Sequence, residues 1–482
     1  MSYFLGIDLG ASSLKASLVD AHARQLGAAS AAIASHTPAP GQVEQNPADW
    51  WSALCDALAD LKQNHAQAFA QIEAISFSGG AHIGVLLDAD GEVLRPAIMW
   101  SDQRAGEQAA ALQNETIEAS TANRPNPTWT LPQLIWLQTH ESQLMRKLAR
   151  LSFAKDWLRS QLTQDWQTDS SEAVGAMLAD YQSATWSDAL LARAGLTRDQ
   201  LPPIVDMQAS AGFVTPQASA LTGLKSGIAV YQGAIDTTME WLCCGPLSNQ
   251  TASLKLASAG VLAFSDASAT PFSPVSLYPH VLPDSHYHAA GMNNCIGALH
   301  WMRQLYLSDI SLEDMQSLAQ SAPLGSRGVL FYPYLNGERA PLWDPSLTAS
   351  LQGLTRGTDR ASLARAAYEG IGHALTEIFN DMTSKLGRKP DHLHILGGGA
   401  QSPFWAQMLA DMMDVTLSRG LQTDASFAAA LLAMGAHNQT PNLADMASAG
   451  YQPGDHFTPD KARHIDYVNF HNEFLARRAN NR

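Results

Sequence analysis

The chain has 482 residues, which is too long for one compact core and predicts two domains. Hydrophobic residues make up 46% and charged residues 16%, which is typical of a globular protein and excludes a disordered one. The formal net charge of -15 argues against a general nucleic-acid binder, because the phosphate backbone would be repelled. A local pocket could still hold a small anion.

Location and redox state follow from two further features. No apolar stretch approaches the roughly 20 residues that span a bilayer, and the N-terminus lacks the basic region and cleavage site of a signal peptide. The four cysteines, Cys55, Cys243, Cys244 and Cys295, form no CxxC or zinc-type spacing. We therefore expect reduced, mostly buried thiols in a cytoplasmic protein without a membrane partner.

Residues 3–20 predict a β-hairpin with a tip that carries almost no side chains. The segment "YFLGID" is apolar, "LGASS" supplies small turn residues, and "LKASLVD" alternates apolar with small or polar residues. Backbone N–H groups can approach a phosphate only where Cβ atoms do not block them. The tip therefore suits a phosphate, to which Lys15 would add charge; an ordinary turn and a solvated lysine are the alternatives.

Asp8 ends the first predicted strand, directly before this tip. A carboxylate at the end of a buried strand costs desolvation unless a cation lies near it. We expect Mg²⁺, bound to the phosphates and reached through water, to supply that charge. The alternative is an aspartate that stabilises the turn.

Several elements follow the first hairpin. The pattern predicts a helix over 46–64, capped by Asn46 with Pro47 in the first turn. "IEAISFSGG" predicts a strand, "IGVLLDADGEVLRPAIMW" predicts two strands around an Asp-Gly hairpin turn, and "GIAVYQGAID" predicts a further buried strand. Residues 123–190 predict a helical insertion.

The segment "YQGAIDTTMEWL" ends a buried strand at Asp236 and then begins a helix. Thr237 is expected to cap this helix, with Glu240 completing a capping box. Asp236 would then lie just outside, near the positive end of the helix dipole, which favours its ionised form. Such a carboxylate in a partly closed site is competent as a general base. The alternative is that Asp236 itself caps the helix.

The second half repeats the opening pattern. "CGPLSNQ" predicts a boundary, which divides the chain into domains 1–245 and 246–482. "TASLKLASAGVLAFSD" again reads strand, small-residue turn, strand. Two such tips, one in each domain, would grip a polyphosphate from both sides of a cleft.

An alternation of strands and helices continues to the end and predicts an α/β architecture. A long helix over 361–382 precedes the strand 392–396 and a helix over 402–413. "LGGGAQSPFW" places three glycines between strand and helix, where the backbone could approach a base, a ribose or the last phosphate. A tight turn is the alternative, and the segment does not match GxGxxG.

In this order the segments resemble the FGGY family of carbohydrate kinases over essentially the whole chain. "GIDLGASSLKASLVD" is similar to the family's first phosphate motif, "PAIMWSDQRA" to its sugar-side strand and loop, "QGAIDTT" to its run ending in the catalytic aspartate, and "GGGAQSPFWAQMLAD" to its adenosine motif. "FYPYLNGERAPLWDPSLTASLQGLT" with "LARAAYEG" is the most specific stretch. Through "SGGAHIGVLLDADGEVLRPAIMW", the chain resembles the xylulokinase members most.

The resemblance implies two α/β domains of the actin, Hsp70 and RNase H-like fold around a central nucleotide-binding cleft. It implies transfer of a phosphoryl group from ATP, with Mg²⁺, to a sugar hydroxyl, D-xylulose being the best candidate. Asp236 would be the general base and Asp8 would lie near the metal. A homodimer is compatible with the resemblance.

The resemblance also implies site residues on both sides of the cleft. The nucleotide-binding residues it implies are Gly10, Ala11, Ser12, Ser13, Lys15, Ser258, Ala259, Gly260, Gly398, Gly399 and Ala400. The sugar-side residues it implies are Ala81, His82, Trp100, Asp102, Asp236 and Thr237.

The chain departs from the family pattern at four places. Ala11 stands where the first tip usually has Thr, and residues 257–260 read Ala-Ser-Ala-Gly instead of Gly-Thr-Ser-Gly. Gly80 and Ala81 replace a Gln-Met pair, and Thr237 replaces the Asn of xylulokinases. These departures keep three alternatives open: a kinase for another ketose, sugar acid or polyol, a nucleotide-binding regulator with weakened transfer, and a chaperone-like ATPase.

Overall fold

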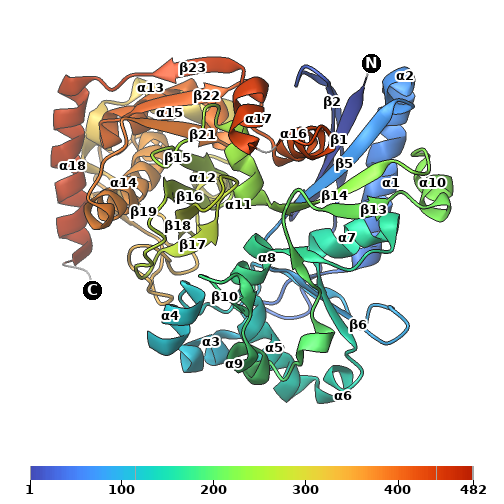
Figure 1. Cartoon of the computed structure of the whole chain (residues 1–482). Coiled ribbons are helices and arrows are strands. Elements are labelled where there is room, and N and C mark those ends of the chain that lie inside the picture. Colours follow the sequence, from blue (N-terminus) through green and yellow to red (C-terminus); the bar gives the residue numbers. More distant parts are fainter. Residues whose placement is uncertain (1, 114, 441, 480–482) are drawn as a thin grey trace.

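The computed structural model describes residues 2–113, 115–440 and 442–479, which form two large mixed sheets flanked by helices (Figure 1). The six-stranded sheet has the order β13 (Ser210–Phe213), β14 (Ala229–Ile235), β5 (Ile72–Gly79), β1 (Tyr3–Leu9), β2 (Ser13–Asp20) and β3 (Gln25–Ala32). The seven-stranded sheet has the order β17 (Ser276–Pro279), β18 (His286–Met292), β16 (Gly260–Asp266), β15 (Ala252–Leu256), β21 (His392–Leu396), β22 (Thr416–Gly420) and β23 (Pro453–Phe457).

Helices cover both sheets, and further helices lie between residues 100 and 200. In the first half the α-helices of seven or more residues are α1 (Pro47–Asn64), α3 (Gly106–Leu112), α4 (Glu115–Thr121), α5 (Thr130–His140), α7 (Ala154–Thr163) and α10 (Pro216–Thr222). In the second half they are α12 (Ile296–Tyr306), α13 (Leu312–Ser321), α14 (Arg360–Leu386), α15 (Pro403–Met413), α16 (Ala425–His437), α17 (Leu443–Gly450) and α18 (Lys461–Ala479). No described helix is long and apolar enough to cross a membrane.

Both predicted hairpins are confirmed. β1 pairs antiparallel with β2, and β15 pairs antiparallel with β16, so each sheet carries one short tip between two central strands. The predicted cap of α1 is also confirmed, because the Asn46 side chain accepts a hydrogen bond from Ala48 N. The four cysteines are free thiols, and Cys55 alone among them is only partly buried.

The hairpin predicted for residues 83–100 forms only close to its turn, and its strands pair mainly with other segments. β6 (Gly84–Leu87) pairs with β8 (Arg150–Phe153), and β7 (Ala97–Ile98) pairs with β4 (Glu44–Gln45). The Asp-Gly turn itself is present: Gly91 N donates to the Asp88 carbonyl, Asp88 N to the Glu92 carbonyl and Leu94 N to the Leu86 carbonyl, around an isolated bridge between Leu87 and Val93. The second strand stays short because β6 takes its longer pairing with β8, a mostly buried strand of the insertion.

The insertion itself is mixed rather than purely helical. β8 and the short strands β9 (Thr168–Asp169), β10 (Ala179–Asp180) and β11 (Thr185–Trp186) lie among its helices. Short apolar runs of this kind cannot be assigned to helix or strand from periodicity alone.

Helix α16 belongs to the second half of the sequence, yet it packs against β1, β2 and β5 of the first sheet (Figure 1). The approach is close, since a Cβ added at Gly6 would lie 1.9 Å from the carbonyl oxygen of Ser426. The hydroxyls of Ser17 and Ser426 share a hydrogen bond of 2.7 Å across the same contact. The late part of the chain therefore returns to the first sheet, and the division at residue 245 stays a prediction.

This packing makes Gly6→Ala a test of the fold. The added methyl group has no space unless backbone moves, so we expect the free energy of unfolding to fall by about 1–3 kcal/mol or more. Urea unfolding would measure the change. Gly106→Ala is the control, because no atom lies within 4 Å of its added Cβ. Equal stability of the two variants would contradict the described contact between α16 and β1.

Candidate active site

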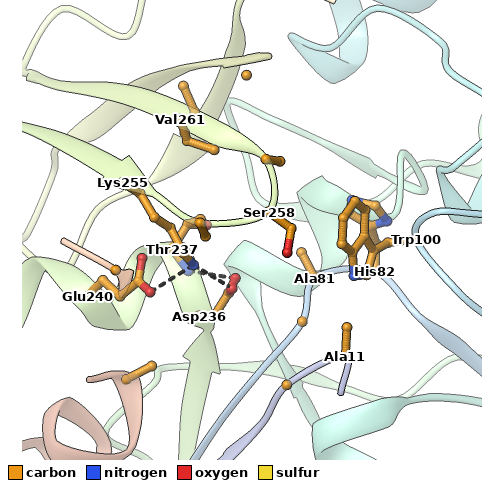
Figure 2. A pocket seen from close by; sticks show the side chains of 18 of the residues that line it. Ala11, Ala81, His82, Trp100, Asp236, Thr237, Glu240, Lys255, Ser258 and Val261 are labelled. Atoms are coloured by element: carbon orange, nitrogen blue, oxygen red, sulfur yellow. Dashed lines mark hydrogen bonds and ion pairs between the residues drawn. The ribbon is translucent and has the colours of Figure 1, made fainter. Parts of the chain in front are cut away.

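A cavity of about 450 Å³ lies between the two sheets, and both hairpin tips line it. β1, β5 and β14 run parallel, so their carboxyl ends reach the same edge of the first sheet. The residues at or just beyond those ends, Asp8, Gly80 and Asp236, line the cavity on one side. Lys255 and the tip that follows it line the cavity from the second sheet (Figure 2).

The first tip is held by hydrogen bonds within the first sheet's domain. Gly10 N donates to the Ser13 carbonyl at 3.1 Å, which closes the turn. Gln45 Nε2 donates to the Ala11 carbonyl at 2.6 Å, and the Trp50 indole N–H donates to Gln45 Oε1 at 2.8 Å. The predicted residues from Gly10 to Lys15 that were named as nucleotide-binding all line the cavity.

The second tip is tied to the start of α12. The Ala257 carbonyl accepts from Ile296 N at 2.9 Å, and the Ser258 carbonyl accepts from Cys295 N at 2.8 Å. Ser258 and Ala259 line the cavity as predicted. Gly260 does not line it, because it lies inside β16, where an added Cβ would come within 2.9 Å of Met292.

The three glycines after β21 have different surroundings. Gly398 lines the cavity, and its nearest neighbour to an added Cβ is 3.8 Å away. An added Cβ at Gly399 would lie 2.8 Å from both Leu256 and Trp405, so this glycine permits close packing. Ala400 is fully buried and does not line the cavity. Of the predicted adenosine residues, the geometry therefore keeps Gly398 alone.

Asp8 is a crowded carboxylate at the cavity wall. Burial and the neighbouring Asp424 and Asp236 carboxylates raise its pKa to about 7. Its Oδ1 is buried and has no hydrogen-bond partner among the described residues. An oxygen of this kind fits a hard cation such as Mg²⁺. The described residues contain no group of three or more His, Cys, Asp or Glu side chains that could hold a metal by themselves, so phosphate and water would complete the shell.

Asp236 begins the short helix α11 (Asp236–Met239), and the predicted capping box was wrong. The N-cap position is Ile235, and no side chain caps the helix. The Thr237 hydroxyl instead shares a hydrogen bond of 3.0 Å with the Tyr287 hydroxyl, and Glu240 faces Lys255. Asp236 Oδ1 accepts from Thr237 N at 2.7 Å, and 28% of the Asp236 side chain stays exposed toward the cavity.

Lys255 joins the base candidate to a second acid. Its Nζ lies 3.0 Å from Asp236 Oδ2 and 2.8 Å from Glu240 Oε1 (Figure 2). Burial alone would lower the pKa of Lys255, but the two carboxylates outweigh burial and raise that pKa above its ordinary value. Both Lys255 and Glu240 line the cavity, and neither was predicted as a site residue.

Lys15 is occupied in a comparable way. Its Nζ lies 2.5 Å from Asp424 Oδ2, and 46% of its side chain is exposed. Asp424 caps α16 through a hydrogen bond from Ser426 N. The predicted phosphate lysine therefore lies at the cavity but is paired with an acid from the second half of the chain.

An aromatic wall lies on the sugar side. The His82 ring stacks on Trp129 with centroids 4.3 Å apart, and Trp129 lies against Tyr278 with centroids 6.3 Å apart. Burial lowers the pKa of His82 to about 3, so its imidazole is neutral at physiological pH. His82 N donates to Glu172 Oε1 at 2.7 Å, and the His82 carbonyl accepts from Thr130 Oγ1 at 2.6 Å. These contacts hold a residue whose φ is +50°.

The other predicted sugar-side residues divide into two groups. Ala81, Trp100 and Thr237 line the cavity with His82. Asp102 does not, because it is fully buried in its own loop, where it accepts hydrogen bonds from Arg104 and from Val43 N. Its carboxylate is already satisfied, so we do not retain Asp102 in the sugar site.

Arg339 is a cavity residue that the sequence did not single out. Its Nη2 donates to the Met292 carbonyl at 3.3 Å, and the guanidinium lies against Gly291, where an added Cβ would come within 2.8 Å. Burial lowers the pKa of Arg339 although the neighbouring Glu338 raises it. In the sequence, only its place in the segment "NGERAPLW", part of the stretch most specific to the resemblance, pointed to Arg339.

A buried charge network supports the end of β14. Lys155 Nζ lies 2.7 Å from Asp156 Oδ1 and 2.6 Å from Asp169 Oδ2. Asp169 accepts from the Ser171 hydroxyl, which accepts in turn from Ile235 N at 3.2 Å. Ile235 directly precedes Asp236, the candidate base, so this network of buried charges helps to position the Asp236 carboxylate.

Comparison with known proteins identifies the family of this chain. The N-terminal domain of the FGGY family of carbohydrate kinases matches residues 3–243, and the C-terminal domain of the same family matches residues 257–437. The chain belongs to the FGGY family of carbohydrate kinases. It is therefore an ATP-dependent sugar kinase, and the predicted resemblance is confirmed.

Full-length relatives agree with the family assignment. The chain is 31% identical over 471 residues to the xylulose kinase of Escherichia coli (strain K12), covering 96% of each. The structure of a xyloylose kinase from Brucella ovis has a TM-score of 0.91 at 29% identity and covers 98% of both chains. Ligand-bound xylulose kinase from Lactobacillus acidophilus has a TM-score of 0.92 at 25% identity, covering 99% of this chain and 98% of that one. The predicted two-domain, actin-like kinase fold is confirmed.

The crowding at Asp8 generates a prediction for this kinase without ligand. The pKa of Asp8 in the folded protein, about 7, lies above its ordinary value of 3.8, so the folded protein binds this proton more tightly than the unfolded chain. The resulting stabilisation is fully present below about pH 4 and is lost as the pH rises through about 7. We expect the free energy of unfolding to fall less steeply over this window in Asp8→Asn than in the wild type.

Urea unfolding at a series of pH values, without nucleotide or metal, measures those slopes. Asp90→Asn, in an exposed turn, is the matched control and should keep the wild-type slope. Parallel curves for Asp8→Asn and the wild type would show that Asp8 carries no raised pKa.

Proposed function

We propose that this kinase phosphorylates a ketopentose, with D-xylulose as the best candidate and D-xylulose 5-phosphate as the product. The observation that carries the proposal is the placement of the Asp236 carboxylate in one cavity with both phosphate tips and the aromatic wall. The xylulose kinases named above support the choice of sugar, since they match nearly the whole chain.

In this proposal Asp236 accepts the proton of the sugar hydroxyl. The sugar oxygen attacks the γ-phosphorus of ATP, the bond from that phosphorus to the β–γ bridging oxygen breaks, and ADP leaves with the electron pair. The backbone at Gly10–Ser13 and Ala257–Ala259 positions the triphosphate, and closure of the cleft excludes water. Mg²⁺ would be held near Asp8 through water and would neutralise charge on the phosphates.

The sugar in this proposal lies against the aromatic wall. The stacked faces of His82 and Trp129 suit the C–H faces of a sugar, while the unpartnered His82 Nδ1 and the Thr237 hydroxyl offer hydrogen bonds. Tyr278 extends the wall from the second sheet, so both halves of the chain would contact the sugar.

A sugar acid is the second candidate substrate. Arg339 places a partly buried guanidinium at the cavity, and such a group pairs strongly with a carboxylate. The sequence departures at Gly80, Ala81 and Thr237 also leave the sugar open. The cytoplasmic location and the homodimer stay predictions.

Asp236→Asn tests the proposed base. An amide cannot accept the proton, yet it keeps the size of the side chain, so we expect kcat to fall by about 10²–10⁴-fold. Affinity for ATP should change little, because the lost interaction belongs to the transition state. Steady-state kinetics with coupled ADP detection gives kcat, and calorimetric titration gives the affinity. Turnover close to that of the wild type would contradict the assignment.

A panel of sugars tests the substrate. Purified enzyme is assayed for ADP release with D-xylulose, other ketoses, polyols and sugar acids such as gluconate. We expect the highest kcat/KM for D-xylulose. A higher kcat/KM for a sugar acid would favour the second candidate, with Arg339 as its carboxylate partner. ATP binding without turnover across the panel would instead favour the nucleotide-binding regulator considered from Ala11 and Ala257.

A further inference from the structure

Lys255 lies between the proposed base, Asp236, and the second phosphate tip. It is the penultimate residue of β15, and the second phosphate tip begins two residues later. In the sheet it pairs with Val261, which also lines the cavity, whereas its neighbours Leu254 and Leu256 are fully buried. Its long side chain therefore crosses from the second sheet toward the end of β14 (Figure 2).

The distances put the Lys255 ammonium within reach of the reacting atoms. A general base must lie about 2.6–3.2 Å from the hydroxyl oxygen whose proton it takes, and that oxygen lies about 3–3.5 Å from the phosphorus it attacks. Lys255 Nζ lies 3.0 Å from Asp236 Oδ2. A phosphoryl group that leaves the tips for a hydroxyl at Asp236 must therefore pass close to this ammonium.

The described protein contacts of Lys255 do not use its full hydrogen-bonding capacity. An ammonium group has three donors, and among the described residues Lys255 Nζ pairs with one oxygen of Asp236 and one of Glu240. Lys15, the other lysine of the cavity, is more exposed, with 46% of its side chain accessible against 20% for Lys255. A cation shielded from water stabilises a nearby anion more strongly.

We propose that Lys255 is a catalytic residue of the phosphoryl transfer, and this inference rests on the proposed function of Asp236. Its third donor binds a non-bridging oxygen of the γ-phosphoryl group, while its pair with Asp236 keeps the base directed at the sugar hydroxyl. Lys255 donates hydrogen bonds and transfers no proton: the hydroxyl proton goes to Asp236 and the electron pair leaves with ADP. Glu240 holds the ammonium in place from the side opposite the base.

Lys255→Met tests the contact, because it keeps the length of the side chain and removes the charge. The decisive readout is the affinity for ADP compared with that for the β,γ-imido analogue of ATP, both with Mg²⁺, measured by calorimetric titration. Hydrogen bonds to charged groups contribute about 1.5–3 kcal/mol, so we expect the analogue to bind at least about tenfold more weakly. ADP, which lacks the γ-phosphoryl group, should bind as it does to the wild type.

Turnover gives a second readout with any sugar that the enzyme accepts. Loss of one preorganised donor to a transition state typically costs about 10²–10³-fold in kcat, and we expect a loss of that size in Lys255→Met. Lys255→Arg should recover part of it, because the charge is kept. Lys389→Met, which removes a surface lysine paired with Asp414, is the control and should bind both nucleotides normally.

Removing Lys255 leaves Asp236 and Glu240 facing each other without a cation, which could prevent folding. The double variant Lys255→Met with Glu240→Gln relieves that repulsion, and the two nucleotide affinities are measured in it as well. Equal weakening of ADP and analogue, or no weakening of either, overturns the proposal. Because the binding test contains no sugar, it stands even if D-xylulose proves to be the wrong substrate.

Discussion

Four carboxylates line the cavity in which we propose that ATP binds, and this electrostatic constraint shapes most of the site. Two unit charges 4 Å apart interact by about 4 kcal/mol at an effective dielectric constant of about 20, so uncompensated repulsion would prevent binding. The carboxylates among the described lining residues are Asp8, Asp236, Glu240 and Asp424, and the cations are Lys15, Lys255 and Arg339. Each of the two lysines is paired with at least one of these acids, so the charges of the lining residues largely neutralise one another.

The two hairpin tips reduce this repulsion, because they offer backbone N–H groups instead of charged side chains. They bring no further acid into the cavity. The tips were predictable because small residues between two strands are visible in the sequence, and so is an acid at the end of a buried strand. Asp8 and Asp236 were found in this way. Their meeting at one edge follows from the parallel pairing of β1, β5 and β14.

Other residues of the site were not predictable, because they come from elements far away in the sequence. Gln45 anchors the first tip from β4, and Arg339 enters from a segment that had no assigned role. Asp102 was predicted at the sugar side but does not line the cavity. Its carboxylate is already bound by Arg104, two residues away, and by Val43 N. Lys255 did carry a signal. It is a charge between two fully buried leucines directly before a tip, which is the same pattern that singled out Asp8.

The placement of Lys255 also links the two sheets. Asp236 follows a strand of the first sheet and Lys255 lies in a strand of the second, so their ion pair holds the proposed base beside the second hairpin tip. α16 makes a second link, since it packs on the first sheet while its cap, Asp424, holds Lys15. A lysine ammonium is a compact charge on a flexible stem. It can therefore follow a phosphoryl group from tip to sugar, which the shorter hydroxyl of a serine or threonine in the tip cannot do.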